Sequence, residues 1–198
     1  VGNLFSLKSS FAAIGSECIV SCNPADLRAA DRIVLPGVGA FGDAARLLFE
    51  SNGLETLLEE VGRGKPLLGI CLGMQLLFER SYEYGVHEGL GLLRGEIVPM
   101  KERISSALKV PHIGWNALHF GEKKDELFKY IDEGDCVYFV HSYYAHLCPD
   151  AIATARFGER EEMFSAALKY ENFYGTQFHP EKSERVGLAI LKAFCEIN

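Results

Sequence analysis

The sequence predicts an α/β domain, with a mixed, mainly parallel sheet flanked by helices and a smaller antiparallel sheet. In the first part of the chain, short apolar segments alternate with segments of helical periodicity. Past Tyr84 the pattern changes to short strands separated by turns, which favours antiparallel pairing. The 198 residues contain no internal repeat, low-complexity segment or linker, so we expect one domain over 1–198.

The elements expected in the first part follow from the spacing of apolar residues. Apolar side chains recur at helical intervals from Leu4 to Ile14, and Asn3 is able to cap this helix. After it we expect, in order, a short strand at 17–21, a small helix or turn at 24–30, a strand at 32–35, a helical stretch interrupted at 52–53 and ending at 62–64, and a strand at 66–70 followed by a helix through 78.

The second part is expected to be mostly strands. They are predicted at 91–99, 109–118 and 135–145, as a hairpin of 152–157 with 164–170, and at 173–178. A closing helix is expected from about 184 to 195, with apolar residues at Val186, Ile190, Leu191 and Phe194.

Composition and charge exclude several classes of partner. Acidic residues outnumber basic ones by 27 to 20, which argues against nucleic acid and anionic membranes. No apolar stretch approaches the length of a membrane span, and no signal peptide opens the sequence. The six cysteines show no CxxC spacing, so we expect a reduced, cytoplasmic protein without disulfides, metal site or cofactor.

The segment 66–78, PLLGICLGMQLLF, is the most informative part of the sequence. An apolar strand leads to Cys71, which stands between Gly69 and Gly73 and precedes a helical pattern. Strand, sharp turn and helix form a nucleophile elbow, in which the first amide after the nucleophile, here that of Leu72, stabilises an oxyanion. Taken alone, the segment is equally compatible with a buried structural cysteine in a βα turn.

The loop 36–39, Pro-Gly-Val-Gly, follows a predicted strand and precedes a helix. This position lies at the carboxyl edge of a parallel sheet, where ligands of α/β proteins bind. The glycines on both sides of Val38 leave its peptide free to rotate. A plain glycine turn is the simpler interpretation of this loop in isolation.

A cysteine nucleophile requires a base, and His179 is the best placed histidine. It ends a predicted strand, and Pro180 keeps it extended. Glu181, two residues on, is near enough to orient the imidazole. His112 and His141 are rivals without a carboxylate at such close spacing. Cysteine, glycine loop and histidine together would place nucleophile, oxyanion donors and base at one sheet edge.

These motifs resemble those of the class I glutamine amidotransferases, which use a Cys-His-Glu triad on a flavodoxin-like fold. The matching segments are GICLGMQ at 69–75, LPGVG at 35–39 and FHPEKS at 178–183. The resemblance implies that Cys71 is the nucleophile, that His179 is the general base and acid, and that Glu181 orients it.

Within that family the sequence is similar to the glutaminase subunits of imidazole glycerol phosphate synthase. This narrower match rests on VGNL at 1–4, VPHIGWN at 110–116 and YFVHSYYA at 138–145. It implies glutamine as substrate and a (β/α)₈ cyclase subunit as partner in a heterodimer of histidine biosynthesis, with weak activity in the partner's absence. In the family a strand precedes the VGNL segment, and we expect the sheet of these residues to lack it.

The resemblance also implies roles for further residues. It assigns the oxyanion hole to the amides of Val38 and Leu72, glutamine binding to Gly39, Gln75 and the backbone of His141, Ser142 and Tyr143, and contact with the partner to Asn3, Trp115, Tyr138 and Lys182. We further hypothesise that the loop 36–39 is a switch that turns the Val38 amide toward the site when the partner holds its substrate.

Three other functions remain open at this stage. A glutaminase subunit of another amidotransferase, such as anthranilate synthase, would share the triad but not the 110–116 and 138–145 segments. A non-catalytic interaction subunit of the same fold would have no use for Cys71, His179 and Glu181. A cysteine hydrolase of the same broad fold would react with peptide rather than glutamine electrophiles.

Overall fold

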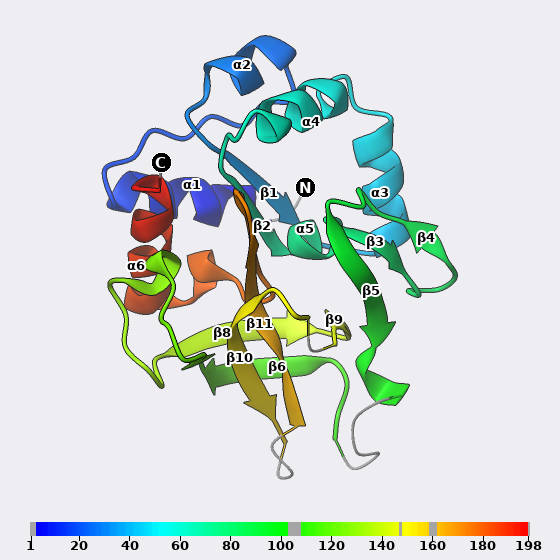
Figure 1. Ribbon diagram of the computed structural model, residues 1–198, viewed down its shortest axis with the longest axis vertical. Helices are drawn as coiled ribbons and strands as arrows, with labels where there is room; N and C mark the ends of the chain where they lie inside the picture. The colour runs from blue at the N-terminus through cyan, green and yellow to red at the C-terminus, as the bar shows by residue number, and fades with distance from the viewer. Residues whose placement is uncertain (1–2, 103–107, 147, 159–161, 198) are drawn as a thin grey trace.

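The computed structural model of the protein describes residues 3–102, 108–146, 148–158 and 162–197 (Figure 1). Val1 and Gly2, which open the VGNL match, lie outside the described residues. The helices are α1 (Leu4–Ala13), α2 (Pro24–Ala29), α3 (Phe41–Phe49), α4 (Leu54–Gly62), α5 (Leu72–Gln75) and α6 (Glu184–Cys195), with 3₁₀ turns η1 (Met100–Glu102), η2 (Glu126–Phe128) and η3 (Pro180–Lys182). The strands are β1 (Ile33–Gly37), β2 (Leu67–Cys71), β3 (Phe78–Ser81), β4 (His87–Glu88), β5 (Leu93–Pro99), β6 (His112–Ala117), β7 (His119–Phe120), β8 (Cys136–His141), β9 (Tyr143–Ala145), β10 (Ala151–Phe157), β11 (Glu162–Tyr170) and β12 (Phe173–Thr176).

The central sheet is mixed, as expected, with the strand order β1-β2-β12-β11-β10-β7. Strands β1, β2 and β12 are parallel to one another, whereas β12, β11, β10 and β7 pair antiparallel. The sheet is therefore less parallel than we expected. The reason is local: Glu171, in the left-handed region with φ 53°, and Asn172 join β11 and β12 in a tight hairpin that reverses the chain.

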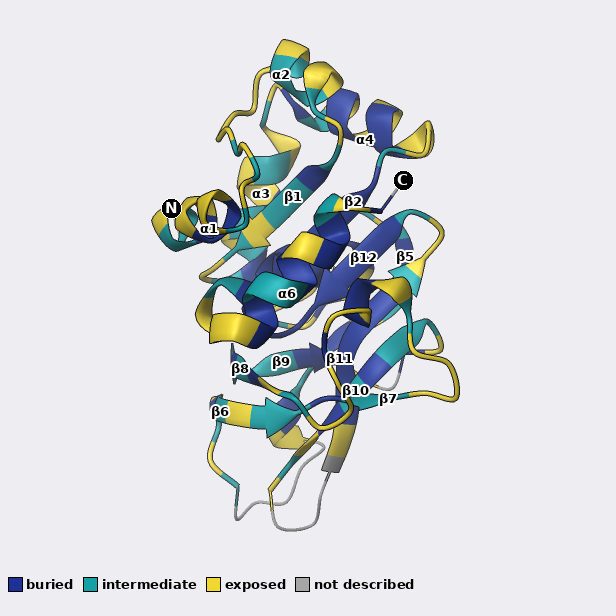
Figure 2. Ribbon diagram, turned by 90° about the vertical axis from the view of Figure 1, so that its left-hand side faces the viewer, coloured by how far each residue is buried: buried dark blue, intermediate teal, exposed yellow. Residues whose placement is uncertain are grey.

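The central sheet is covered on both faces. Helices α1 and α6 cover one face, and α3, α4 and the second sheet cover the other. Figure 2 shows α6 in front of the dark, buried strands of the central sheet, with α1 to the left of it. Along β2, Leu68 and Ile70 pack toward α1 and α6, and Leu67 packs on the other side, against α3, α4 and the sheet β4-β3-β5-β9. The strand is buried throughout because it is covered on both faces.

The expected strand at 17–21 is wrong. No ladder includes these residues, and the side chains of Ile19 and Val20 are 57% and 54% exposed. β-branched residues favour strands only where a neighbouring strand pairs with them, and no described strand lies beside this segment.

The expected helix after the cysteine is much shorter than its periodicity indicated. Helix α5 ends at Gln75, and β3 begins at Phe78. Leu76, Leu77 and Phe78 are all buried, which a helix with one apolar face does not achieve. Strand β3 instead pairs with β4 and β5.

The expected strand at 135–145 is divided between two sheets. Strand β8 pairs with β6 in a two-stranded antiparallel sheet, and β9 pairs with β5 in the four-stranded sheet. Ser142 lies at the point where the chain passes from one sheet to the other. The other predicted elements are present, with ends that differ by a few residues.

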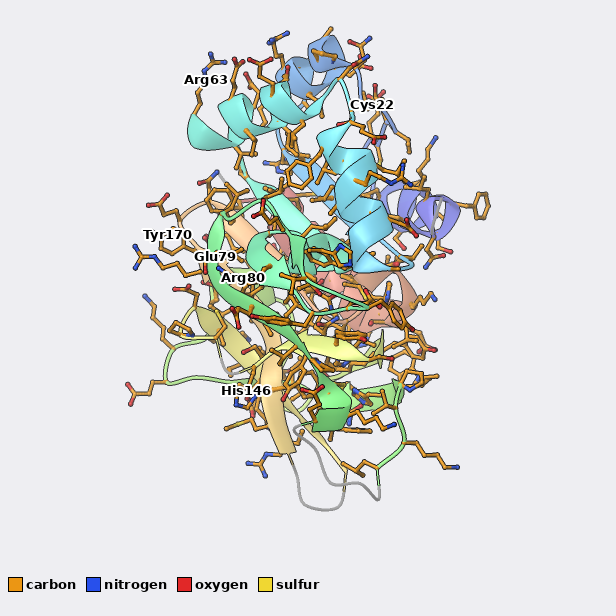
Figure 3. All side chains as sticks on the ribbon, turned by 90° about the vertical axis from the view of Figure 1, so that its right-hand side faces the viewer. Cys22, Arg63, Glu79, Arg80, His146 and Tyr170 are labelled. Atoms are coloured by element: carbon orange, nitrogen blue, oxygen red, sulfur yellow. The ribbon has the colours of Figure 1, made fainter. Side chains whose placement is uncertain are left out.

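The outer side of the four-stranded sheet, which Figure 3 shows, carries polar side chains. Arg80 of β3 forms an ion pair of 3.5 Å with Glu96, its register partner on β5. Within the described ranges, no helix combines the length and apolar character that a membrane crossing requires.

Candidate active site

Cys71 lies at the end of β2 in a backbone conformation that is rare for a residue with a side chain. Its φ is 52° and its ψ is −111°. The flanking glycines are required by space: a Cβ on Gly69 would lie 2.6 Å from the Met74 Cα, and one on Gly73 would lie 1.8 Å from the Leu35 carbonyl oxygen. The predicted elbow is present, and close packing of β1, β2 and α5 holds it.

His179 follows β12, the parallel neighbour of β2, so the two strand ends lie side by side. Its backbone N–H donates to the Tyr138 carbonyl at 3.0 Å, and its Nδ1 lies 2.9 Å from Oε1 of Glu181. Burial lowers the pKa of His179, but hydrogen bonds with Cys71 and Glu181 outweigh burial and raise the pKa to about 9.

Glu181 is held by more than the histidine. Its side chain is 4% exposed, and Oε1 also accepts a hydrogen bond of 3.0 Å from Nδ2 of Asn3. Burial raises the pKa of this carboxyl, but the hydrogen bonds from His179 and Asn3 and the charge of His179 lower it overall. Asn3, predicted at the partner interface, therefore contacts the carboxylate that orients the histidine.

A chain of amide hydrogen bonds connects the sulfur to the cavity wall. Gln177 Nε2 approaches Cys71 Sγ at 3.7 Å, and Gln177 Oε1 accepts from Gln75 Nε2 at 3.0 Å. Gln75 Nε2 also donates to the Tyr143 carbonyl at 3.0 Å. Gln75 was predicted; Gln177 was missed, although its position two residues before His179 puts both side chains on one side of an extended segment.

A cavity of about 280 Å³ adjoins these groups, a size that suits an amino acid. Its lining includes every residue predicted for the nucleophile, base, oxyanion hole and substrate: Val38, Gly39, Cys71, Leu72, Gln75, His141, Ser142, Tyr143 and His179. Lys182, predicted at the interface, also lines it. The structure thus brings together four segments that are far apart in sequence.

Glu83 also lines this cavity and was missed. Its Oε2 accepts a hydrogen bond of 2.6 Å from the Phe41 N–H at the start of α3. The residue belongs to no motif and follows β3 in a turn, so the sequence contained no signal for it. It contributes a carboxylate to the lining of this cavity.

The glycine loop is constrained at one glycine and open at the other. A Cβ on Gly37 would lie 2.6 Å from the Gly73 backbone nitrogen, so this position packs against the elbow. Gly39 has φ 98°, and a Cβ there would meet nothing within 4 Å. The Val38 side chain between them is 47% exposed. Close packing fixes the first glycine, and backbone conformation requires the second.

Three of the residues predicted at the partner interface form one group, in which Trp115 and Lys182 are exposed and Tyr138 is partly buried. The rings of Trp115 and Tyr138 lie 5.9 Å apart, and Lys182 Nζ lies 5.7 Å from the Tyr138 ring. Trp115 and its neighbour Ile113 are 47% and 58% exposed. Their role in an interface remains a prediction. In the part of the chain that the structure describes, no group of three or more His, Cys, Asp or Glu side chains is arranged to hold a metal ion.

Comparison with known proteins agrees with this geometry. The family model "Glutamine amidotransferase class-I" matches residues 3–197. The chain is 47% identical to "Imidazole glycerol phosphate synthase subunit HisH" of Wolinella succinogenes, over 100% of this chain and 96% of that protein. It is 44% identical to the subunit of the same name from Aquifex aeolicus, over 98% and 91% of the two chains.

Solved structures share the fold at low sequence identity. A structure described as "Crystal structure of glutamine amidotransferase" superposes with a TM-score of 0.72 at 17% identity, covering 98% of this chain and 95% of that chain. The structure of PurLQS from Thermotoga maritima gives a TM-score of 0.69 at 16% identity, covering 98% and 92%. The chain belongs to the class I glutamine amidotransferase family.

Proposed function

We propose that this protein is the glutaminase subunit of an imidazole glycerol phosphate synthase, which hydrolyses glutamine and delivers the ammonia to a cyclase subunit for histidine biosynthesis. The observation that carries the proposal is that Cys71 and His179 line one cavity and contact each other. Glu181 holds the His179 ring and favours its charged form. Relatives that are 44–47% identical over nearly the whole chain bear the name of that synthase subunit.

In the first chemical step the proton of the Cys71 thiol passes to His179, and the sulfur attacks the side-chain amide carbon of glutamine. The carbon–sulfur bond forms as the carbonyl oxygen takes up the electron pair, and the amides of Val38 and Leu72 stabilise this oxyanion. Loss of one such donor typically costs ~10²–10³ in rate. His179 then gives its proton to the leaving nitrogen, the carbon–nitrogen bond breaks, and ammonia and a thioester result.

The second step releases glutamate. His179, now neutral, takes a proton from water, the hydroxide attacks the thioester carbon, and the sulfur leaves as thiolate. Glu181 stabilises the imidazolium in both steps and holds the tautomer with the proton on Nδ1. Asn3 supports Glu181 in this orientation. Gln177, at 3.7 Å from the sulfur, is a donor that would stabilise the thiolate.

Substrate selection follows from the groups that line the cavity. Glu83 supplies a carboxylate for the α-ammonium group of glutamine, and the backbone at Ser142 and Tyr143 supplies donors for its α-carboxylate. Peptides lack both free charged groups, which supports glutamine over a peptide as substrate. We assign Gly39 and Gln75 to the same subsite because both line the cavity.

The partner in this proposal is a (β/α)₈ cyclase subunit that meets the group of Trp115, Tyr138 and Lys182. An enzyme that hydrolysed glutamine without an acceptor would lose ammonia to solvent. We therefore expect partner-dependent turnover, with the Val38 peptide between its two glycines as the switch. Val38 is half-exposed, and the open space at Gly39 supports rotation there.

The test is glutamate release by the purified chain, with and without the cyclase subunit and its nucleotide substrate. We expect strong stimulation by the partner and loss of turnover in Cys71→Ala. Cys148→Ala is the matched control, since both sulfur-bearing side chains are 8% exposed. Turnover that survives in Cys71→Ala, or that is lost equally in Cys148→Ala, would contradict the proposal. Stimulation by a chorismate-using enzyme instead would indicate a different amidotransferase.

A further inference from the structure

Two buried histidines that the mechanism does not use lie at the cavity wall and directly behind it. His112 on β6 and His141 on β8 are register partners, and they are 2% and 6% exposed. His112 Nδ1 lies 3.1 Å from His141 Nε2, so the two rings are hydrogen-bonded to each other. His141 also lines the cavity, so the pair reaches from the two-stranded sheet to the proposed glutamine site.

Each end of this pair faces a hydrogen-bond acceptor. His112 Nε2 lies 2.7 Å from Oδ1 of Asn116. The amide of Asn116 has a fixed orientation, because its Nδ2 donates to the Arg156 carbonyl at 2.8 Å and a flipped amide would turn oxygen toward oxygen. At the other end His141 Nδ1 lies 3.0 Å from the Tyr143 carbonyl oxygen.

Counting protons along this row determines its charge. The row has three contacts, from the Asn116 oxygen through both rings to the Tyr143 oxygen, and each contact needs one hydrogen. Two neutral imidazoles carry only two N–H groups between them. A neutral pair would therefore leave two acceptors facing each other at hydrogen-bond distance at one of the three contacts, each of which involves a buried histidine ring, an arrangement that proteins avoid.

We propose that His112 and His141 share one additional proton, carry a single positive charge, and so position the wall of the glutamine cavity. The charge lies behind the Ser142–Tyr143 segment. The Tyr143 carbonyl accepts from both His141 Nδ1 and Gln75 Nε2, so its peptide is fixed from two sides. The role assigned here rests on the proposed glutaminase function, because the anion that benefits is the α-carboxylate of bound glutamine.

The surroundings of the pair suit a cation. The His112 ring centroid lies 4.1 Å from that of Phe157, 5.3 Å from that of Phe139 and 5.7 Å from that of Phe164. The His141 centroid lies 5.2 Å from that of Phe164. Aromatic faces within about 6 Å stabilise a desolvated cation. The proton count indicates the charge, and these aromatic rings provide surroundings in which a buried cation is stabilised.

Burial acts against this charge. It lowers the pKa of both rings, that of His141 to about 3, and part of the lowering for His141 comes from repulsion by a charge on His112. When the two rings share one proton, only one charge is present, so the repulsion between His112 and His141 does not arise. The three hydrogen bonds of the row all favour the protonated form.

Other titratable groups face the pair. His179, which follows β12, lowers the pKa of His141 by its charge, but that charge is balanced by Glu181. The Cys71 sulfur, at the end of β2, lies 3.9 Å from the carbonyl oxygen of Val140, which precedes His141 in sequence. Strand β9 contributes Tyr143, and β10 contributes the carbonyl of Arg156 through Asn116.

The direct test counts ring protons by NMR on the full chain with ¹⁵N-labelled histidine. At neutral pH the four ring nitrogens of the pair should together show one unprotonated nitrogen. Two unprotonated nitrogens at that pH would overturn the proposal. This measurement needs no variant and no activity, so it remains decisive if the glutaminase proposal fails.

A variant at Asn116 tests whether the hydrogen-bond acceptors determine the number of ring protons. Asn116→Leu removes one acceptor at the end of the row, and the remaining two contacts need only two protons. We therefore expect the pair to become neutral in this variant, with two unprotonated nitrogens. A count that does not change between wild type and Asn116→Leu would contradict the link between the acceptors and the charge.

Kinetics in the complex with the cyclase test the positioning role. His112→Phe fits the aromatic surroundings and removes the shared proton, and we expect the KM for glutamine to rise about tenfold, which is ~1.4 kcal/mol, with kcat little changed. The wild-type KM should rise as pH increases and the pair loses its proton, whereas the KM of His112→Phe should lack that rise. The control is His119→Phe, whose side chain lies outside the pair, in an ion pair with Glu133. An unchanged KM in His112→Phe, or the same pH dependence in both proteins, would refute the role.

Discussion

Replacing Glu181 by glutamine separates the charge of this residue from its geometry. Oε1 of Glu181 accepts from His179 Nδ1 at 2.9 Å and from Asn3 Nδ2 at 3.0 Å. Oε2 is buried and has no hydrogen-bond partner within the described ranges. In Glu181→Gln an amide oxygen at the Oε1 position keeps both hydrogen bonds, and the new NH₂ group takes the place of Oε2.

The strength of this orientation can be worked out from the two bonds. A flipped amide would lose both, at ~1 kcal/mol each, and would turn donors toward donors, so the correct orientation is favoured by about 2–3 kcal/mol, or roughly 30- to 150-fold. His179 then keeps its tautomer, and only the carboxylate charge is lost. We expect turnover to fall about 10²-fold, well short of the ~10⁴ that a wrong tautomer costs in a serine triad.

Asn3 is the residue that selects between the two orientations of the amide. Alone, Asn3→Ala should reduce turnover only about threefold, because the carboxylate has no wrong orientation. Combined with Glu181→Gln it weakens this selection, and turnover should fall further than the product of the two single effects, because the wrong amide orientation keeps His179 in the wrong tautomer. The assay is glutamate release by the complex with the cyclase and its nucleotide substrate.

Asn23→Ala, which removes an exposed helix cap of α2, is the control for the asparagine change. It should leave turnover unchanged. If the double variant is no slower than the product of the two single effects, Asn3 does not select the amide orientation, and the reasoning fails.

Three further predictions follow from the elbow, the cavity and the charged histidine. Gly73→Ala should destabilise the protein by more than ~3 kcal/mol in urea unfolding, since its Cβ would lie 1.8 Å from the Leu35 carbonyl oxygen, whereas Gly62→Ala, with nothing within 4 Å, should be neutral or stabilising. Similar losses in both would contradict the packing argument. Glu83→Gln should raise the KM for glutamine about tenfold with kcat nearly unchanged, and an unchanged KM would remove Glu83 from the subsite. Burial lowers the pKa of His179, yet its hydrogen bonds raise the pKa from 6.5 to about 9, so its contribution to stability is complete below the unfolded value and is lost as pH rises through about 9. The difference in unfolding free energy between wild type and His179→Gln should shrink over that interval, and a difference that grows would be the wrong sign.

The arrangement of the candidate site was largely predictable because each part has a local sequence requirement. Gly69 and Gly73 are where a Cβ would collide with neighbouring backbone, and His179 with Glu181 needs only two residues of spacing. Strand ends at one sheet edge then bring distant motifs together. The sequence did not reveal contacts that depend on tertiary structure. Glu83 reaches the cavity from an ordinary turn, and no local pattern indicates its position.

The errors in the fold share a physical cause. Apolar periodicity reports burial, and the burial of 76–78 on all sides produced the same pattern as one helix face. The segment 17–21 has strand propensity without a neighbour to pair with. The division of 135–145 at Ser142 depends on which sheet each half joins, a long-range choice that composition does not encode.

The backbone conformation of Cys71 lowers the stability of the folded protein. A residue other than glycine held at φ 52° and ψ −111° costs on the order of 1–3 kcal/mol, a large part of the margin by which a small domain remains folded. A chain that only recruited a partner would gain stability by giving up this cysteine for glycine. This chain keeps a thiol at a position where its backbone is strained, which indicates that the thiol is retained for its reactivity and at the expense of stability.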